Sequence, residues 1–119
     1  MNKISLAEKF KLFSETWTPK IIGEIDDYDI KIAKIEGSFE WHSHADADEF
    51  FFVVSGKRRM KYRDREELLG PGDIIVVPRG VEHLPVAEPS AEIMMIERKG
   101  TVNTGDARGA RTVSDLERL

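Results

Sequence analysis

The hydrophobic pattern of the chain changes near Pro19. Before this proline, apolar residues recur at the spacing of one helix face: Leu6, Phe10 and Phe13. Ser5 followed three positions later by Glu8 forms a capping box, in which the hydroxyl and the carboxylate satisfy the first free N–H groups of a helix. The pattern therefore predicts one short helix, within residues 1–15, whose apolar stripe docks on the rest of the protein.

Beyond Pro19 the chain is divided into short apolar runs, most of them rich in β-branched or aromatic residues and bounded by Gly, Pro or Asp. The runs predicted as strands are Ile21–Ile25, Tyr28–Ile35, Phe39–His44, Glu49–Val54, Lys57–Tyr62, Glu66–Leu69, Ile74–Val77, Val81–Val86 and Ala91–Glu97. About eight or nine evenly spaced strands favour an all-β closed barrel or sandwich. No helical crossover fits between them, which argues against a parallel α/β sheet.

The length of 119 residues favours one domain. Residues 16–98 are expected to form the barrel. The last segment, residues 99–119, contains Gly100, Gly105 and Gly109 among few apolar residues. We expect this segment to be an arm packed on or beside the barrel.

Composition and charge narrow the classes of function. The chain carries 18 Lys and Arg against 22 Asp and Glu, a net charge of -4, so nucleic acid is not the expected partner. It has no cysteine, which excludes disulfides and thiolate chemistry. No apolar run is long enough to span a membrane and no signal core opens the sequence, so we expect a cytoplasmic protein. The basic residues of segment 57–65 are interpreted as a solvated strand face, with a nucleic-acid patch as the alternative.

The three histidines of the chain carry the clearest chemical signal. His42 and His44 are two positions apart, so both imidazoles project from the same face of a strand. Glu49 has the phase of the apolar residues that follow it, which predicts an inward carboxylate. His83 follows a Pro-Arg-Gly turn and supplies a third nitrogen if the barrel closes. Three imidazoles and one carboxylate suit Mn, Fe, Co, Ni, Cu or Zn, and an ion that prefers six ligands would keep two positions open.

These residues resemble the two sequence motifs of the cupin superfamily. In the first motif the matching residues are Gly37, His42, His44, Glu49 and Gly56, with Gly37 one residue nearer the first histidine than usual. In the second they are Gly72, Pro78, Gly80 and His83, while Ala87 stands where the motif has asparagine. The chain is similar to small single-domain bacterial cupins, some labelled mannose-6-phosphate isomerase-like.

The resemblance implies a double-stranded β-helix, or jelly-roll, for most of the chain. It also implies that His42, His44, Glu49 and His83 bind one divalent ion, with Mn, Fe, Ni or Zn as candidates. Asp46 and Asp48 lie between the first motif's ligands and are interpreted as turn residues.

Two classes of function fit the sequence. In one, the protein is a metalloenzyme whose ion binds a small polar metabolite for sugar-type isomerisation or oxidative chemistry. In the other, it is a non-catalytic module that holds a metal or small ligand. Glu40 shares the strand face of the two neighbouring histidines, and we predict it as a catalytic general base.

A homodimer is the expected assembly. The N-terminal segment is more apolar than one small barrel needs, through Trp17, Ile21, Ile22 and Ile25. The runs Phe50–Phe52 and Ile74–Val77 lack alternation, so both faces of these strands are expected to be covered. A partner subunit and the N-terminal helix are the two candidates for the outer cover.

Overall fold

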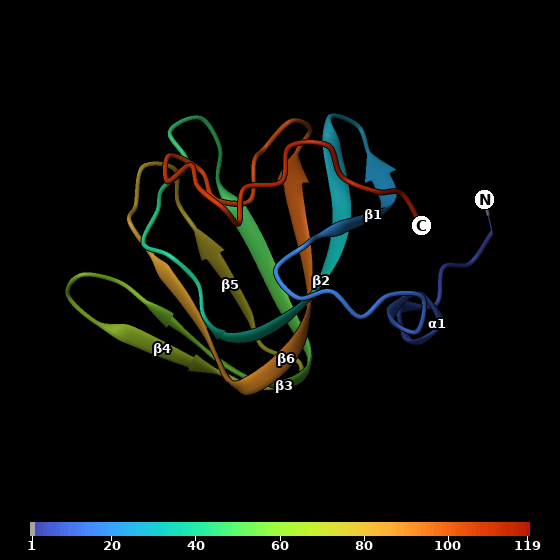
Figure 1. Cartoon of the computed structure of the whole chain (residues 1–119), viewed down its shortest axis with the longest axis horizontal. Helices are drawn as coiled ribbons and strands as arrows, with labels where there is room; N and C mark the ends of the chain where they lie inside the picture. Colours follow the sequence, from blue (N-terminus) through green and yellow to red (C-terminus); the bar gives the residue numbers. More distant parts are fainter. Residues whose placement is uncertain (1) are drawn as a thin grey trace.

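A computed structural model describes residues 2–119. The predicted helix is present as α1 (Leu6–Phe10), beside the barrel (Figure 1). The hydroxyl half of the predicted capping box is confirmed, since the backbone N–H of Glu8 donates to Ser5 Oγ at 3.3 Å. The helix is only five residues long. Phe13, the last residue of the apolar stripe, lies beyond its end and is nevertheless buried.

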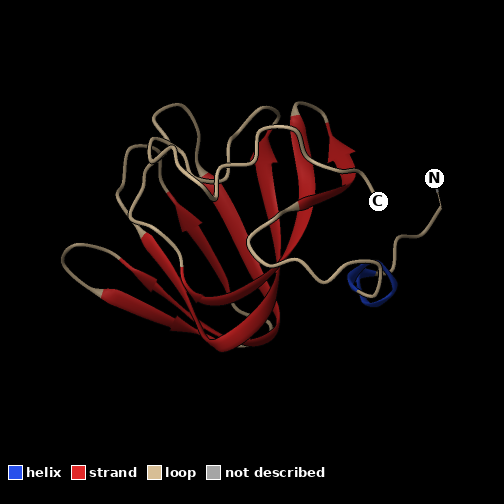
Figure 2. Cartoon of the chain, viewed as in Figure 1, coloured by secondary structure: helices blue, strands red, loops and turns tan. Residues whose placement is uncertain are grey.

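Six antiparallel strands form the body of the protein (Figure 2). They are β1 (Lys20–Ile25), β2 (Tyr28–Ser38), β3 (Glu49–Lys61), β4 (Glu66–Leu69), β5 (Ile74–Val77) and β6 (Leu84–Arg98). Their order is β1-β2-β6-β3-β4, and β5 pairs with β3. The bent sheet curls around one interior, which confirms the all-β jelly-roll with a short N-terminal helix.

The strands are fewer and longer than the sequence pattern predicts. β3 joins two predicted strands and β6 joins two more, because each long strand continues through a register shift. At the shift in β3, Gly56 has φ +81° and lies so close to the Ser90 carbonyl that a Cβ would collide with it. The predicted strand Phe39–His44 is wrong: this segment is not a strand, and it contacts the chain around His83 through an isolated bridge between His42 and His83 and a hydrogen bond from the Phe39 N–H to the Pro85 carbonyl.

Two apolar clusters lie on opposite faces of the sheet. The inner cluster fills the barrel and includes Phe51, Val53, Met60 and Ile93. The outer cluster joins Phe10, Phe13, Ile22 and Ile32, so the N-terminal segment covers the outer face of β1 and β2. Burying these side chains supplies the main driving force for folding.

The outer face of β5 differs from the sequence-based expectation. Ile74 and Val76 are 58% and 51% exposed, so residues 2–119 do not cover them. Helix α1 packs instead against the outer cluster. Of the two candidate covers, the N-terminal helix is therefore wrong for this strand.

The C-terminal segment runs across one end of the barrel, drawn red at the top of Figure 1. Its last residues lie beside β1: Ile21 donates its N–H to the Glu117 carbonyl, and Leu119 donates to the Ile21 carbonyl, both at 2.9 Å. Thr104 in the same segment is fully buried. No helix within residues 2–119 has the length and apolarity to cross a membrane.

Candidate metal centre

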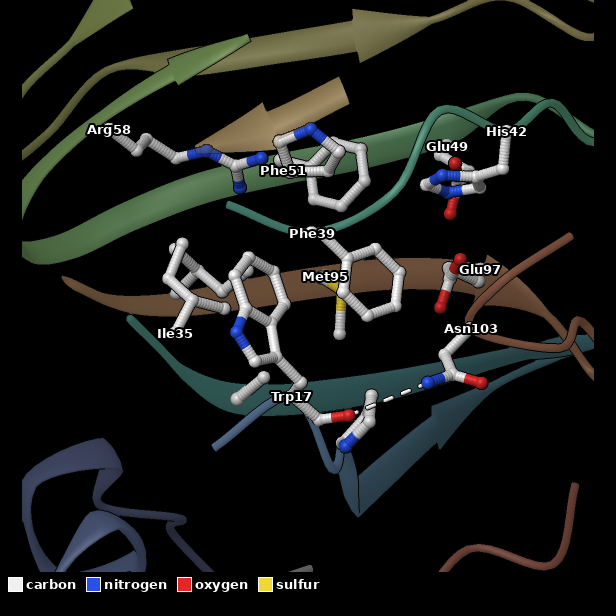
Figure 3. A pocket seen from close by; sticks show the side chains of 14 residues that line it. Trp17, Ile35, Phe39, His42, Glu49, Phe51, Arg58, Met95, Glu97 and Asn103 are labelled. Carbon is white, nitrogen blue, oxygen red and sulfur yellow. Dashed lines mark hydrogen bonds between the residues drawn. The ribbon is translucent and has the colours of Figure 1, made fainter. Parts of the chain in front are cut away.

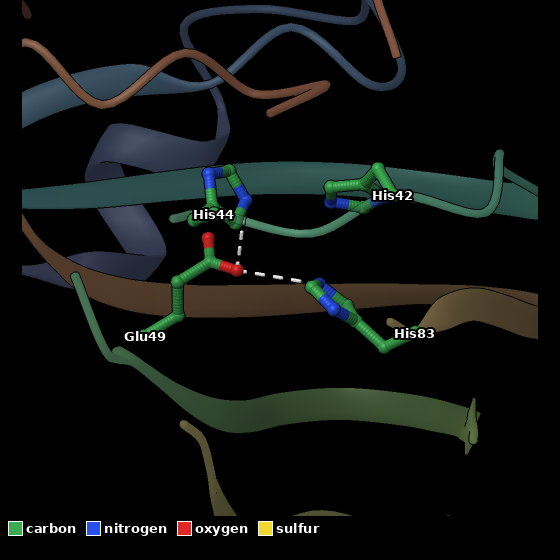
Figure 4. A group of neighbouring side chains, drawn as sticks. All are labelled: His42, His44, Glu49 and His83. Atoms are coloured by element: carbon green, nitrogen blue, oxygen red, sulfur yellow. Dashed lines mark ion pairs between the residues drawn. The ribbon is translucent and has the colours of Figure 1, made fainter. Parts of the chain in front are cut away.

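Four buried side chains converge at the end of the barrel that the C-terminal segment crosses (Figure 4). Glu49 is the first residue of β3, His42 and His44 precede it, and His83 lies just before β6. One ligand atom from each residue lies within 4.8 Å of the other three. The structure thus brings together all four residues that the sequence predicts as metal ligands.

The backbone fixes the orientation of two of the imidazoles. His42 Nδ1 lies 2.8 Å from the Glu40 carbonyl oxygen, and His83 Nδ1 lies 3.0 Å from that of Val81. A carbonyl only accepts, so each Nδ1 carries the proton and donates it. This leaves the lone pair on Nε2, the tautomer in which that atom can bind a metal.

The atoms that face the centre of the cluster are close but are not hydrogen-bonded. Glu49 Oε1 lies 2.9 Å from His44 Nε2 and 3.3 Å from His83 Nε2. All three atoms are buried, and none makes a hydrogen bond of acceptable direction within the described chain. Buried polar atoms without hydrogen bonds are costly. A cation among them would satisfy all three, so the residues fit a divalent transition ion.

The protonation states also suit a cation. Burial, followed by the nearby His83, lowers the pKa of His42 to about 4, so this imidazole is neutral at pH 7. Burial alone would raise the pKa of Glu49, but the close approach of Glu97, His44 and His83 outweighs burial and holds it well below its usual value. Neutral imidazole and ionised carboxylate are the forms that coordinate metals.

Glu97 is a site residue that the sequence reasoning missed. It is buried near the end of β6, and Lys31 Nζ lies 3.2 Å from its Oε1. Burial and then the negative charge of Glu49 raise its pKa well above the ordinary value. The signal was present in the sequence, because Glu97 continues the inward alternation of Ile93 and Met95 along the predicted strand.

An apolar cavity opens beside the cluster (Figure 3). The space between its lining side chains is about 450 Å³ when the open solvent at its mouth is counted. The side chains that line it include Trp17, Ile35, Phe39, His42, Glu49, Phe51, Arg58, Met95, Glu97 and Asn103. The cavity thus joins two of the predicted ligands to a mainly apolar wall.

Arg58 corrects the interpretation of segment 57–65 as a wholly solvated face. This arginine is fully buried and lines the cavity. Its neighbour Arg59 fits the interpretation, because it is partly exposed and paired with Glu66 and Glu88. These surface ion pairs also weaken the case for a nucleic-acid patch.

The other predicted site residues lie outside the cluster. Asp46 and Asp48 are exposed, and Asp48 Oδ1 accepts the backbone N–H of Arg79 at 2.9 Å, as suits a loop residue. Glu40 is half-buried and contributes its carbonyl to His42. Its side chain is not among those that line the described cavity, and its catalytic role stays a prediction.

The sequence model of the cupin domain matches residues 29–97, more than half of the chain. The protein belongs to the cupin family. The uncharacterized protein YdbB of Bacillus subtilis is 30% identical over 89 residues, which are 66% of this chain and 79% of that protein.

Two solved structures extend the comparison. A cupin-2 domain protein from Shewanella frigidimarina is 44% identical with a TM-score of 0.80, covering 81% of this cupin and 94% of that chain. A protein from Neisseria meningitidis is 27% identical with a TM-score of 0.75, covering 82% and 100%. The match spans nearly the whole of both relatives, so this cupin has their overall architecture.

Proposed function

We propose that this cupin is a metalloenzyme that binds one divalent ion through His42, His44, Glu49 and His83 and acts on a small polar metabolite. The observation that carries the proposal is the set of buried nitrogen and oxygen atoms without hydrogen bonds that converge beside an apolar cavity. A bound ion with open positions would supply Lewis-acid or redox chemistry to a metabolite in that cavity. Mn, Fe, Ni and Zn all accept this donor set.

Other residues of the chain would enclose the metabolite and move a proton. Trp17 stacks on Phe39 with ring centroids 4.5 Å apart, and this pair forms an apolar wall that would exclude water from the metabolite. Two carboxylates are candidates for moving a proton. Glu97 lines the cavity, whereas Glu40 is the candidate from the sequence.

The test combines metal loading with two assays. The purified protein is loaded separately with Mn²⁺, Fe²⁺, Ni²⁺ and Zn²⁺ and mixed with small hydroxy acids, keto acids and sugars. Proton NMR in D₂O detects isomerisation through deuterium uptake, and an oxygen electrode detects oxidative turnover. We expect one metal form to give one of these signals and the His83→Ala variant to give none.

Two further variants assign the proton-transfer group. Glu97→Gln and Glu40→Gln each remove one ionisable carboxylate at nearly constant size. Loss of turnover with retained metal in only one of them identifies that residue. If every metal form of the wild type lacks both signals but still binds metabolites, the non-catalytic module is the better description.

A further inference from the structure

Arg58 lies on β3 and points into the barrel, where its guanidinium faces the same cavity as His42 and Glu49 (Figure 3). Its exposed fraction is 0%. If side chains alternated strictly along β3 from the inward Glu49, the side chain at position 58 would point outward. The register shifts on either side of Gly56 reverse the alternation, so Arg58 shares the inner face with Met60.

The guanidinium has almost no polar partner. Nε and Nη1 make no hydrogen bond within residues 2–119, and Nη2 reaches only the sulfur of Met60, at 4.0 Å. The group also lies 5.0 Å from the centre of the Phe51 ring. Burial lowers the pKa of Arg58 to about 10, so the side chain is still a cation at pH 7.

The other buried cations of the described chain are compensated. Lys20 lies 2.8 Å from carboxylate oxygens of both Glu15 and Glu117, and Lys31 lies 3.2 Å from Glu97. A buried charge without such a partner is expensive, because it has lost its hydration. The stability of the fold therefore does not explain why a buried arginine with unpaired N–H groups stands at this position.

Arg58 and two residues of the candidate metal centre line the same cavity. One part of its lining is formed by His42 and Glu49, another by Arg58, and the wall includes Trp17 and Phe39. A ligand in this cavity would meet an ion, an apolar wall and a cation. Glu97 also lines the cavity, but it is paired with Lys31. With a divalent ion bound, that ion and Arg58 outweigh the remaining negative charge of Glu49, so an anionic ligand would balance the site.

We propose that Arg58 binds the carboxylate of a small ligand whose other end carries an oxygen that reaches the metal. This inference rests on the proposed metal centre and narrows its substrate class to small carboxylates. A carboxylate is favoured over a phosphate because its single charge matches the one arginine among the cavity's mainly apolar side chains.

The probes are dicarboxylates of increasing length: succinate, glutarate and adipate. One carboxylate of each can bind the ion and the other can bind Arg58. Butyrate, pentanoate and hexanoate omit one carboxylate, and inorganic phosphate tests the other oxyanion. Calorimetric titration measures binding to metal-loaded and to chelator-treated protein. Arg58→Met removes the cation at similar length, Arg58→Lys keeps a charge, and Arg59→Met is the control for loss of an arginine on the same strand.

For the loaded wild type, we expect at least one dicarboxylate to bind about tenfold or more tightly than the matched monocarboxylate. Arg58→Met should lose this preference while keeping its metal, Arg58→Lys should keep part of it, and Arg59→Met should keep it all. Chelator-treated wild type should still bind butyrate, but more weakly than the metal-loaded protein binds it. Arg58→Met should weaken butyrate binding by the chelator-treated protein further.

The two proposals fail in different ways. A wild type that holds no metal contradicts the proposed centre, and the butyrate comparison then still tests Arg58. Equal binding of butyrate by chelator-treated wild type and Arg58→Met overturns the inference. Three other results would also overturn it. The loaded wild type could show no preference for dicarboxylates, Arg58→Met could keep that preference, or the loaded wild type could bind phosphate more tightly than any dicarboxylate.

Discussion

Two backbone hydrogen bonds join His42 and His83. The N–H of His42 donates to the His83 carbonyl at 3.0 Å, and the N–H of His83 donates back to the His42 carbonyl at 2.9 Å. This bridge is isolated from the strand ladders, and the two rings lie 4.2 Å apart between centroids. The two cupin motifs, far apart in the sequence, are thus joined at histidines of the candidate metal centre.

Acid should destabilise the metal-free protein through His42. Its pKa is about 4 in the folded chain because of burial, and about 6.5 in an unfolded chain. Between these values the unfolded state binds a proton that the folded state does not, so stability falls as the pH is lowered through this window. Urea titrations should show a loss of about 2 kcal/mol between pH 7 and pH 5.

A His42→Gln variant is the control for this pH dependence, because it has no imidazole to titrate at this position. Its urea midpoint should change less between pH 7 and pH 5. An equal change in the variant and the wild type would assign the pH dependence to other groups.

The C-terminal segment should support the metal centre through Gly105. This residue has φ +55°, and a Cβ there would collide with the Ser43 carbonyl and lie 3.1 Å from His44 Cε1. Gly105→Ala should therefore destabilise the protein by about 1–3 kcal/mol and weaken metal retention. Thermal unfolding and metal analysis measure the two effects.

Gly109→Ala is the matched control for Gly105→Ala. It lies in the same segment, and a Cβ there meets no atom within 4 Å. Its stability and metal content should stay near those of the wild type. Equal effects of the two substitutions would show that the close approach of Gly105 to Ser43 has no special role.

Replacing Arg58 should stabilise the fold. Arg58→Met removes a buried cation and keeps a side chain of similar length in contact with the inner cluster. We expect a gain of about 1 kcal/mol or more in the free energy of unfolding, measured by urea titration. A loss of stability would mean that the guanidinium has a structural role, for example through its contact with Phe51.

The homodimer stays a prediction, and β5 gives it a location. Ile74 and Val76 expose their side chains on its outer face, where a second copy could cover them. Light scattering at micromolar concentration should give twice the chain mass of 13.6 kDa, and Val76→Lys should return the protein to a monomer. A wild-type mass near 13.6 kDa would contradict the dimer.

The four residues of the candidate metal centre could be predicted because their signal is local. The spacing of His42 and His44, the phase of Glu49 and the turn before His83 can all be read directly from neighbouring residues. The jelly-roll followed from the same motifs and from the short apolar runs.

Arg58 could not be placed in the same way. Its inward direction depends on the register shifts beside Gly56, and these depend on how β3 pairs with β6. A one-residue shift exchanges the two faces of a strand, so Arg58 and Arg59 exchange environments. The inward direction of Glu97 could be predicted from its alternation with Met95. A single glutamate at a strand end, however, belongs to no distinctive motif.

Metal content after dialysis tests the central claim most directly, with circular dichroism to show that each variant is folded. The wild type should retain about one ion per chain. Glu49→Gln and His83→Ala should each retain at least tenfold less, because each removes a donor from the same ion. Asp48→Asn should retain as much as the wild type. Full metal content in His83→Ala, or loss of metal in Asp48→Asn with full content in Glu49→Gln, would contradict the proposed centre.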